Sequence, residues 1–256
     1  MKTIAIIPVR MGSSRFMGKP LAMICGIPMV EHCLRRTELA GCFDAVYVAT
    51  CDEEIREYIE GIGGNVVMTS TRHSRATTRT AEAVENVQNV NGEFYDIVVM
   101  VQGDEALILP ETIAQTVPHF EDPAVSIVNI MSRLKTEAQF RDPNNVKVVV
   151  NQSGNALYFS REPIPSAWKG VDGVPMYMQT GTIAFRNATL KAFNAMPETG
   201  LEQIESVDMN RVLETGGSIR MVMTDAITIG VDTPEELAEA ERMMKDDSVM
   251  PLYSDN

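Results

Sequence analysis

The sequence has little cysteine, a shortage of positive charge, and no apolar run long enough to cross a membrane. Its four cysteines are Cys25, Cys33, Cys42 and Cys51. They form no CxxC pair and have no histidine grouping that would complete a zinc site, so we interpret them as reduced thiols. The first ten residues, interrupted by Pro8 and Arg10, are too short for a secretory signal, and no run approaches the roughly 18 apolar residues of a membrane span. We therefore expect a cytoplasmic protein with no membrane partner.

The charge balance excludes another class of partner. The chain carries 22 Lys and Arg residues against 35 Asp and Glu, a formal net charge of -13. Proteins that bind duplex nucleic acid generally need an excess of cationic side chains, so we expect no nucleic-acid partner. With 256 residues, 45% of them hydrophobic and 22% charged, the chain can bury a sizeable core, which excludes a disordered or fibrous protein. We predict a single domain over residues 1–256.

Apolar runs rich in Val and Ile alternate with amphipathic stretches, as expected when crossover helices join parallel strands. Expected strands lie at 3–8, 45–50, 66–69, 96–101, 124–131, 146–150, 176–185, 219–223 and 227–231, and expected helices at 29–40, 53–62, 79–90, 202–215 and 234–245. We predict an α/β fold with a mostly parallel central sheet flanked by helices, and a β-rich insertion at about 140–200. Asp52 is expected to cap the second helix, and Asp232 or Thr233 the last one, while residues 246–256 are expected to fray.

A basic loop follows the first strand, where open α/β sheets place their ligands. It reads RMGSSRFMGKP and contains three cations in ten residues, Arg10, Arg15 and Lys19. Gly12 and Gly18 free backbone N–H groups to turn toward phosphate oxygens. A solvated turn is the plain alternative, but this spacing after a buried strand favours a triphosphate site.

Two common phosphate-binding motifs do not fit this loop. A Walker A motif needs four residues between its glycines and a Ser or Thr after Lys, whereas five residues separate Gly12 from Gly18 and Pro20 follows Lys19. The GxGxxG fingerprint is missing too, which disfavours a nicotinamide or flavin cofactor.

Two acidic residues end neighbouring parts of the expected sheet. Asp104 follows the central strand and Asp232 follows the last one. A parallel sheet could bring both carboxylates to one edge, where they would suit Mg²⁺, which takes one or two carboxylates plus phosphate and water. Either residue could instead be only a loop cap, and Asp232 stands well placed for that before Thr233 and Pro234.

Several ordered motifs carry a resemblance that spans nearly the whole chain. They are IIPVRMGSSRFMGKPL at 6–21, VQGDE at 101–105, PNNVKVV at 143–149, ALYFSR at 156–161 and GVDTPEEL at 230–237. In these segments the sequence resembles the sugar-acid cytidylyltransferases, in particular the 3-deoxy-manno-octulosonate (KDO) cytidylyltransferases. The resemblance implies a nucleotide-diphospho-sugar transferase-like fold, a homodimer contact within about 140–200, and a role in making lipopolysaccharide or capsule precursors.

The resemblance also implies a reaction, in which the anomeric hydroxyl of a sugar acid attacks the α-phosphorus of CTP and pyrophosphate leaves. The residues it implies for catalysis are Arg10, Lys19, Gln102, Asp104 and Asp232, the two aspartates holding Mg²⁺. Those implied for the nucleotide are Arg10, Gly12, Ser13, Ser14, Arg15, Lys19, Arg79 and Gln102, and those for the sugar acid are Gln102, Arg161, Gln179 and Asp208. An ordinary surface ion pair is the alternative for Arg161.

Some positions depart from the family pattern. Gln179-Thr180-Gly181 stands where KDO enzymes have His-Leu-Gly, and Asp208-Met209-Asn210-Arg211 stands for Glu-Gln-Leu-Arg. Such replacements of hydrogen-bonding partners predict a changed sugar preference, so a related acidic ketose is our hypothesis, with KDO the leading single candidate. Arg75-Ala76 replaces Ser-Gly in the 71–79 loop, which leaves the roles of His73 and Arg75 open.

Three alternatives stay open at this point. One is an acylneuraminate cytidylyltransferase, which would share the basic loop and differ in its sugar. Another is a non-catalytic nucleotide-binding homologue, against which the joint presence of the basic loop and both aspartates argues. The third is a metal-dependent glycosyltransferase, although Gly103-Asp104-Glu105 is not a DxD pair.

Overall fold

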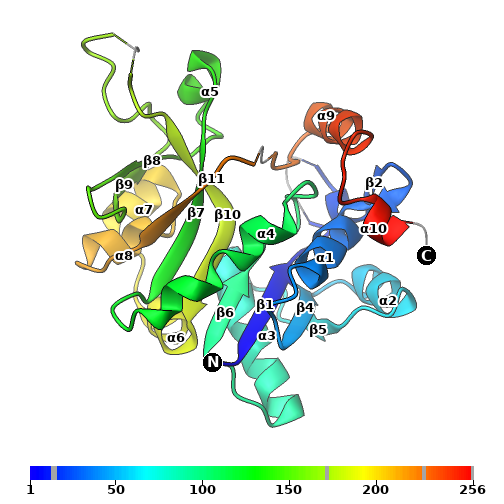
Figure 1. Cartoon of the computed structure of the whole chain (residues 1–256). Coiled ribbons are helices and arrows are strands. Elements are labelled where there is room, and N and C mark those ends of the chain that lie inside the picture. Colours follow the sequence, from blue (N-terminus) through cyan, green and yellow to red (C-terminus); the bar gives the residue numbers. More distant parts are fainter. Residues whose placement is uncertain (13–15, 171–172, 227–228, 255–256) are drawn as a thin grey trace.

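The structure is a computed structural model that describes residues 1–12, 16–170, 173–226 and 229–254. Nine strands of this part of the chain form one sheet with helices on both faces (Figure 1). The strands are β1 Thr3–Pro8, β4 Ala45–Thr50, β5 Val66–Met68, β6 Ile97–Met100, β7 Ile127–Arg133, β8 Lys147–Val150, β9 Ala156–Ser160, β10 Tyr177–Arg186 and β11 Arg220–Thr224. A short hairpin, β2 Met23–Ile24 and β3 Ile27–Pro28, lies apart from the sheet.

The helices confirm the predicted α/β class. They are α1 Met29–Leu39, α2 Glu53–Gly61, α3 Ala76–Asn91, α4 Pro110–Ala114, α5 Glu137–Arg141, α6 Asn187–Ala195, α7 Gly200–Glu205, α8 Asn210–Glu214, α9 Pro234–Met244 and α10 Pro251–Ser254, with 3₁₀ turns η1 Lys19–Leu21 and η2 Val117–Glu121. None of those in the described ranges is long and apolar enough to cross a membrane.

The sheet runs in the order β11-β7-β10-β6-β1-β4-β5. From β6 to β5 every pair is parallel, as is β11 with β7. Only β10 runs against its neighbours β6 and β7, and the β8–β9 hairpin joins the sheet through it. The carboxyl ends of β1 and β6 therefore meet at one edge, and the loops that follow them lie together there.

Strand β1 shows why residues 4–7 are all apolar. Ile4 and Ile6 belong to the core cluster on one face of the sheet, and Ala5 and Ile7 to the cluster on the other. Since side chains alternate along a strand, a strand covered by helices on both sides must be apolar at every position.

The predicted helix at 202–215 is wrong. It is broken between α7 and α8, where Ser206 adopts φ 53°. Val207 and Met209, two positions apart, are both buried in the same core cluster, whereas a continuous helix would turn them about 200° away from each other. Helix α3 also begins at Ala76 rather than at 79.

The structure tests the predicted caps of α2 and α9 and the strand expected at 227–231. Asp52 makes no capping bond to α2, because its carboxylate accepts the Met11 N–H at 2.8 Å. Thr233 is the cap of α9, its hydroxyl accepting the Glu236 N–H at 3.2 Å. The strand expected at 227–231 is not formed at 229–231, and Ile227 and Thr228 lie outside the described residues.

The carboxyl-terminal residues were expected to fray, and that prediction is wrong for the described part of 246–256. Helix α10 lies against α1 (Figure 1), and the Tyr253 hydroxyl is hydrogen-bonded to His32 and Arg36. Asp247 forms an ion pair with the buried Arg36. A buried arginine needs such partners, and they come from a segment more than 200 residues away in the sequence.

Candidate active site

The ammonium group of Lys19 joins the two aspartates that the sequence singled out. Its Nζ lies 2.8 Å from Oδ2 of Asp104 and 2.8 Å from Oδ1 of Asp232, and it also donates to the Val231 carbonyl at 3.1 Å. Burial alone would lower the pKa of Lys19, but attraction to Asp104 and Asp232 outweighs it and raises the pKa above its ordinary value. The basic loop, the end of β6 and the start of α9 thus converge at one point.

Backbone contacts hold the two aspartates in register. The Val231 N–H donates to the Asp104 carbonyl at 3.0 Å. The Asp232 N–H donates to the carboxylate of Glu236 at 2.7 Å, while Thr233 caps the same turn. Asp232 is therefore part of the first turn of α9, which the Thr233 hydroxyl caps.

Glu105 supports this edge of the sheet, although the sequence suggested no role for it. It is 6% exposed, and its carboxylate accepts the Gly181 N–H at 2.7 Å and the Thr182 hydroxyl at 3.4 Å. Burial raises the pKa of Glu105 to about 7, with the charge of Asp104 adding to the effect. The sequence feature that could have indicated this role is the position of an acidic residue directly before the apolar run at 106–109.

Two glycines allow the strands to approach closely at the site. A Cβ on Gly103 would lie 2.1 Å from Cγ1 of Val9, at the start of the basic loop. A Cβ on Gly181 would lie 2.3 Å from Cγ of Gln102. Both distances are far below normal contact, so neither position leaves room for a side chain.

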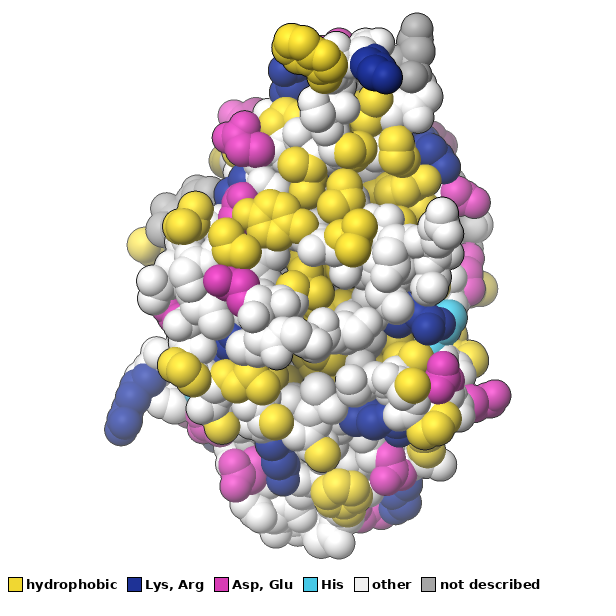
Figure 2. Space-filling view, turned by 90° about the vertical axis from the view of Figure 1, so that its left-hand side faces the viewer, with side chains coloured by type: hydrophobic (Ala, Val, Ile, Leu, Met, Phe, Trp, Pro, Cys, Tyr) yellow, Lys and Arg dark blue, Asp and Glu magenta, His cyan; other side chains and the backbone are white. Residues whose placement is uncertain are grey.

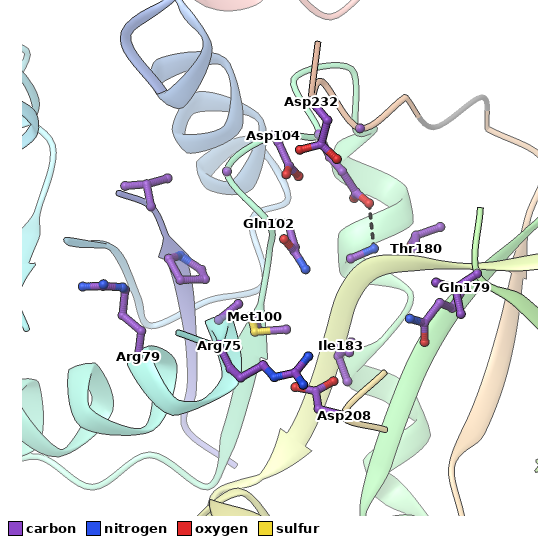
Figure 3. Close-up of a pocket in the computed structure, with 18 of the residues that line it drawn as sticks. Arg75, Arg79, Met100, Gln102, Asp104, Gln179, Thr180, Ile183, Asp208 and Asp232 are labelled. Carbon is purple, nitrogen blue, oxygen red and sulfur yellow. Dashed lines mark hydrogen bonds between the residues drawn. The ribbon is translucent and has the colours of Figure 1, made fainter. Parts of the chain in front are cut away.

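These residues open into a polar cavity of about 530 Å³ (Figure 3). The predicted site residues that line it are Arg10, Lys19, Arg79, Gln102, Asp104, Arg161, Gln179, Asp208 and Asp232. Gly12 does not line it, and Ser13, Ser14 and Arg15 lie outside the described residues. In Figure 3 the Gln102 amide points into the middle of the cavity, between the two aspartates and Asp208.

The loop before α3 lines the cavity through His73, Ser74 and Arg75. His73 is bonded through Nδ1 to the Thr78 hydroxyl at 3.0 Å and through Nε2 to Glu82, and its carbonyl accepts from Arg10 at 3.2 Å. With both ring nitrogens occupied, His73 acts here as a support for the loop and for Arg10. Arg79 is 3% exposed.

The contacts of Arg79 are neutral. Its guanidinium donates to the Thr69 hydroxyl and, at 3.6 Å, to the Cys51 thiol. Across the described residues, no carboxylate forms an ion pair with it. A buried cation without an acidic partner at a cavity wall suits an anionic ligand.

Gln179 and Asp208, which were predicted for the sugar acid, also line the cavity. The Gln179 amide oxygen is buried and has no hydrogen-bond partner among the residues that the structure describes. Asp208 accepts from the Thr77 hydroxyl at 2.8 Å, and burial raises the pKa of its carboxyl. Arg75 reaches toward Asp208 in Figure 3, which gives this arginine a place at the site.

Arg161 also lines the cavity, but its guanidinium is used within the chain. Nε donates to the Glu205 carbonyl and Nη1 to the Pro143 carbonyl, both at 2.8 Å. The surface ion pair considered as an alternative is not formed by this side chain in the described structure.

A metal site at this edge would rest on two carboxylates. No group of three or more His, Cys, Asp or Glu side chains suited to a metal ion occurs in the described ranges. Asp104 and Asp232, both within reach of one ammonium group, are enough for Mg²⁺ when phosphate oxygens and water complete its six ligands. The donor set therefore fits a magnesium ion that binds together with a nucleotide.

Comparison with known proteins places this geometry in context. Residues 4–221 match the family model described as Cytidylyltransferase. The 3-deoxy-manno-octulosonate cytidylyltransferase of Syntrophotalea carbinolica is 40% identical over 254 residues, covering 96% of this chain and 99% of that protein. The protein of the same name from Geobacter metallireducens is 42% identical over 248 residues, covering 93% and 95%.

Solved structures agree with the sequence comparison. The structure of CMP:2-keto-3-deoxy-manno-octonic acid synthetase complexed with CTP superposes with a TM-score of 0.87 at 33% identity, covering 96% of this chain and 99% of that one. A Bacillus anthracis structure named for glucose-1-phosphate thymidylyltransferase, in complex with sucrose, has a TM-score of 0.68 at 16% identity over 97% and 96%, which shows the shared fold alone.

Proposed function

The chain belongs to the cytidylyltransferase family, and we propose that within it the protein activates 3-deoxy-manno-octulosonate with CTP, forming CMP-KDO and pyrophosphate. One observation carries the proposal: Lys19, Asp104 and Asp232, from three distant segments, meet at the rim of a polar cavity. CMP-KDO is the activated form in which KDO enters lipopolysaccharide. The four free cysteines fit our proposal that the enzyme works in the cytoplasm.

In this mechanism the protein binds and aligns, and no covalent protein intermediate is needed. We assign the triphosphate to Arg10 and Lys19, whose charges offset those of the phosphates, with Arg79 as a further nucleotide contact. Asp104 and Asp232 would hold Mg²⁺, which polarises phosphate oxygens and lowers the pKa of a bound hydroxyl. Holding the anomeric hydroxyl in line with the α-phosphorus supplies the rest of the rate increase.

We assign the sugar acid to the side of the cavity that carries Gln102, Gln179 and Asp208. The unpartnered amide oxygen of Gln179 requires a donor, and a sugar hydroxyl would supply one. Among the described residues, the Arg161 guanidinium donates to carbonyl groups through Nε and Nη1, and we assign its Nη2 to a carboxylate of the sugar acid. Sites that hydrogen-bond particular hydroxyls discriminate strongly, so these residues are where the choice of sugar would be made.

The test is pyrophosphate release from CTP and Mg²⁺ with a panel of sugar acids, comparing the wild type with Asp104→Asn. We expect turnover with KDO and a loss of roughly 100- to 1,000-fold in the variant, because a metal ligand contributes several kcal/mol. Arg141→Met, which removes an exposed ion pair with Glu137, is the matched control and should keep full activity. Turnover only with a nine-carbon acylneuraminate, or with another acidic ketose, would change the substrate. No pyrophosphate with any acid would refute the proposal.

We further propose that the enzyme is a homodimer joined through the face formed by β8, β9 and α7. Figure 2 looks onto this side of the molecule, where hydrophobic side chains gather in the upper half. Exposed side chains of these elements include Leu157, 58% exposed, and Ile204, 80% exposed. Apolar groups gathered on one face suit an isologous contact. Sedimentation should give a dimer for the wild type and a monomer for Ile204→Glu, and a monomeric wild type would reject this contact.

A further inference from the structure

A buried arginine on α1 holds the carboxyl-terminal end of the chain. The Arg36 side chain is 0% exposed. Its Nη2 pairs with Asp247 and lies 3.2 Å from Sδ of Met244, and its Nε donates to the Tyr253 hydroxyl at 3.1 Å. Since Met244 is the last residue of α9 and the other two follow it, the guanidinium fixes the far end of that helix.

Helix α9 connects this contact to the active site. It has eleven residues, which corresponds to a length of about 16 Å. At its near end, Asp232 and Thr233 are bonded to Glu236 in the first turn, so Asp232 moves with the helix. The anchored far end and the aspartate at the near end thus belong to one helix.

The same arginine also contacts the segment that carries Asp104. Its Nη1 donates at 3.3 Å to the carbonyl of Ile108, four residues further along the chain. A small apolar cluster fills the space between these segments. Its buried members are Ile24, Met29, Ala106, Leu107, Val231, Ala240 and Met244. The packing and the polar contacts thus join the segments that carry both aspartates to α1.

His32 completes the arrangement on the side of Lys19. One turn before Arg36 on α1, its Nε2 lies 2.9 Å from the carbonyl of Ile24, five residues after Lys19. Because a carbonyl can only accept, Nε2 carries the proton, and Nδ1 accepts from the Tyr253 hydroxyl at 2.7 Å. The tyrosine oxygen in turn accepts from Arg36. Each polar group at the junction has a partner.

We propose that His32, Arg36 and Tyr253 are positioning residues, which set the relative placement of Lys19, Asp104 and Asp232. The proposal rests on the function proposed above, since those three groups are assigned to metal and triphosphate. Two adjacent turns of one helix bind all three segments, and Asp232 lies at the near end of α9, whose far end Arg36 holds. The three residues touch no substrate, and they act through the backbone that carries the site.

A purely structural role and a positioning role predict different results. If the cluster only stabilises the fold, its removal lowers the melting temperature and leaves ligand affinity unchanged in the folded fraction. If the cluster positions Lys19, Asp104 and Asp232, its removal also weakens binding of metal and nucleotide at temperatures where the variant is fully folded. Residues that orient metal ligands typically contribute about 10- to 100-fold to metal affinity.

The experiment measures Mn²⁺ binding by electron paramagnetic resonance in the presence of CTP and without sugar acid. The variants are Tyr253→Phe, which removes one oxygen, and Arg36→Met. The matched control is Arg186→Met, since Arg186 also ties loops together, through the carbonyls of Val125 and Phe120 at 2.8 Å. We expect about a tenfold weaker Mn²⁺ affinity for both variants and an unchanged affinity for the control. KM for the sugar acid should stay within twofold while kcat falls.

The outcomes are distinct from those that test the proposed function. Wild-type affinity in Tyr253→Phe and Arg36→Met, with only the melting temperature lowered, would overturn the positioning role. If Arg36→Met does not fold, Tyr253→Phe decides alone. A wild type that binds Mn²⁺ with CTP but releases no pyrophosphate would defeat the proposed reaction while leaving the comparison of affinities intact.

Discussion

Replacing Gly181 by alanine tests a crowded contact between β10 and Gln102. The new Cβ would lie 2.3 Å from Cγ, 2.8 Å from Cβ and 3.0 Å from Cδ of Gln102, more than 1 Å inside ordinary contact at the closest atom. The Gln102 Cβ cannot rotate away, because it is fixed to the backbone at the end of β6. Relief therefore requires a shift of the backbone or of the whole glutamine side chain. Overpacking of this kind costs about 1–3 kcal/mol.

The expected effects are larger on activity than on folding. For a chain of this size a cost of 1–3 kcal/mol lowers the melting temperature by roughly 2–12 °C. A displacement of about 1 Å at a reacting centre can reduce the rate about 100-fold. We expect kcat/KM for CTP and the sugar acid to fall by about that factor, measured by pyrophosphate release. Gly61→Ala, in α2 with nothing within 4 Å of the added atom, is the control and should be neutral or slightly stabilising. Wild-type kcat/KM in Gly181→Ala would refute the reasoning.

Three further results are expected. Asp232→Asn should lose roughly 100- to 1,000-fold in kcat and weaken Mn²⁺ binding, and equal affinity for the ion would remove this residue from the metal site. Arg211→Met should cost about 3–5 kcal/mol of unfolding free energy in urea, because it leaves the buried Glu202 without its ion pair at 2.6 Å; a loss below 1 kcal/mol would contradict this. Burial lowers the pKa of His32, so the unfolded chain takes up this proton first as the pH falls. Its contribution to stability should be complete above about pH 6.5 and decline below it, and His32→Gln should show a flatter pH profile of the melting temperature.

The part of the site that follows from sheet geometry could be predicted from the sequence. Asp104 follows β6 at the carboxyl edge of the sheet, as expected from parallel strands. Asp232 meets it at one ammonium group as predicted, but the expected strand before it is not formed at 229–231, and the first turn of α9 places it instead. The basic loop was recognisable from its local composition. Its central residues, Ser13, Ser14 and Arg15, lie outside the described part of the chain, so their roles stay predictions.

What the sequence could not predict depends on contacts between distant residues. Helical periodicity suggested a continuous helix at 202–215. No local feature of the sequence indicates that Ser206 adopts a left-handed conformation, which allows Val207 and Met209 both to be buried in the core. The polar end of the chain suggested fraying, because its partners, His32 and Arg36, are encoded more than 200 residues earlier. The role of Glu105 depends on β10 running antiparallel beside β6, which no single strand reveals.

The missing side chain at Gly103 has a bearing on how such an enzyme could be redesigned. A Cβ at this position would lie 2.1 Å from Cγ1 of Val9, so the end of β6 and the start of the basic loop pack together with no room for a side chain between them. Substitutions at the contact between Gly103 and Val9 therefore cannot enlarge the site for a bulkier donor. Changes confined to Gln179 and Asp208, elsewhere on the cavity lining, leave the contact between Gly103 and Val9 untouched and offer the route by which one scaffold could accept different acids.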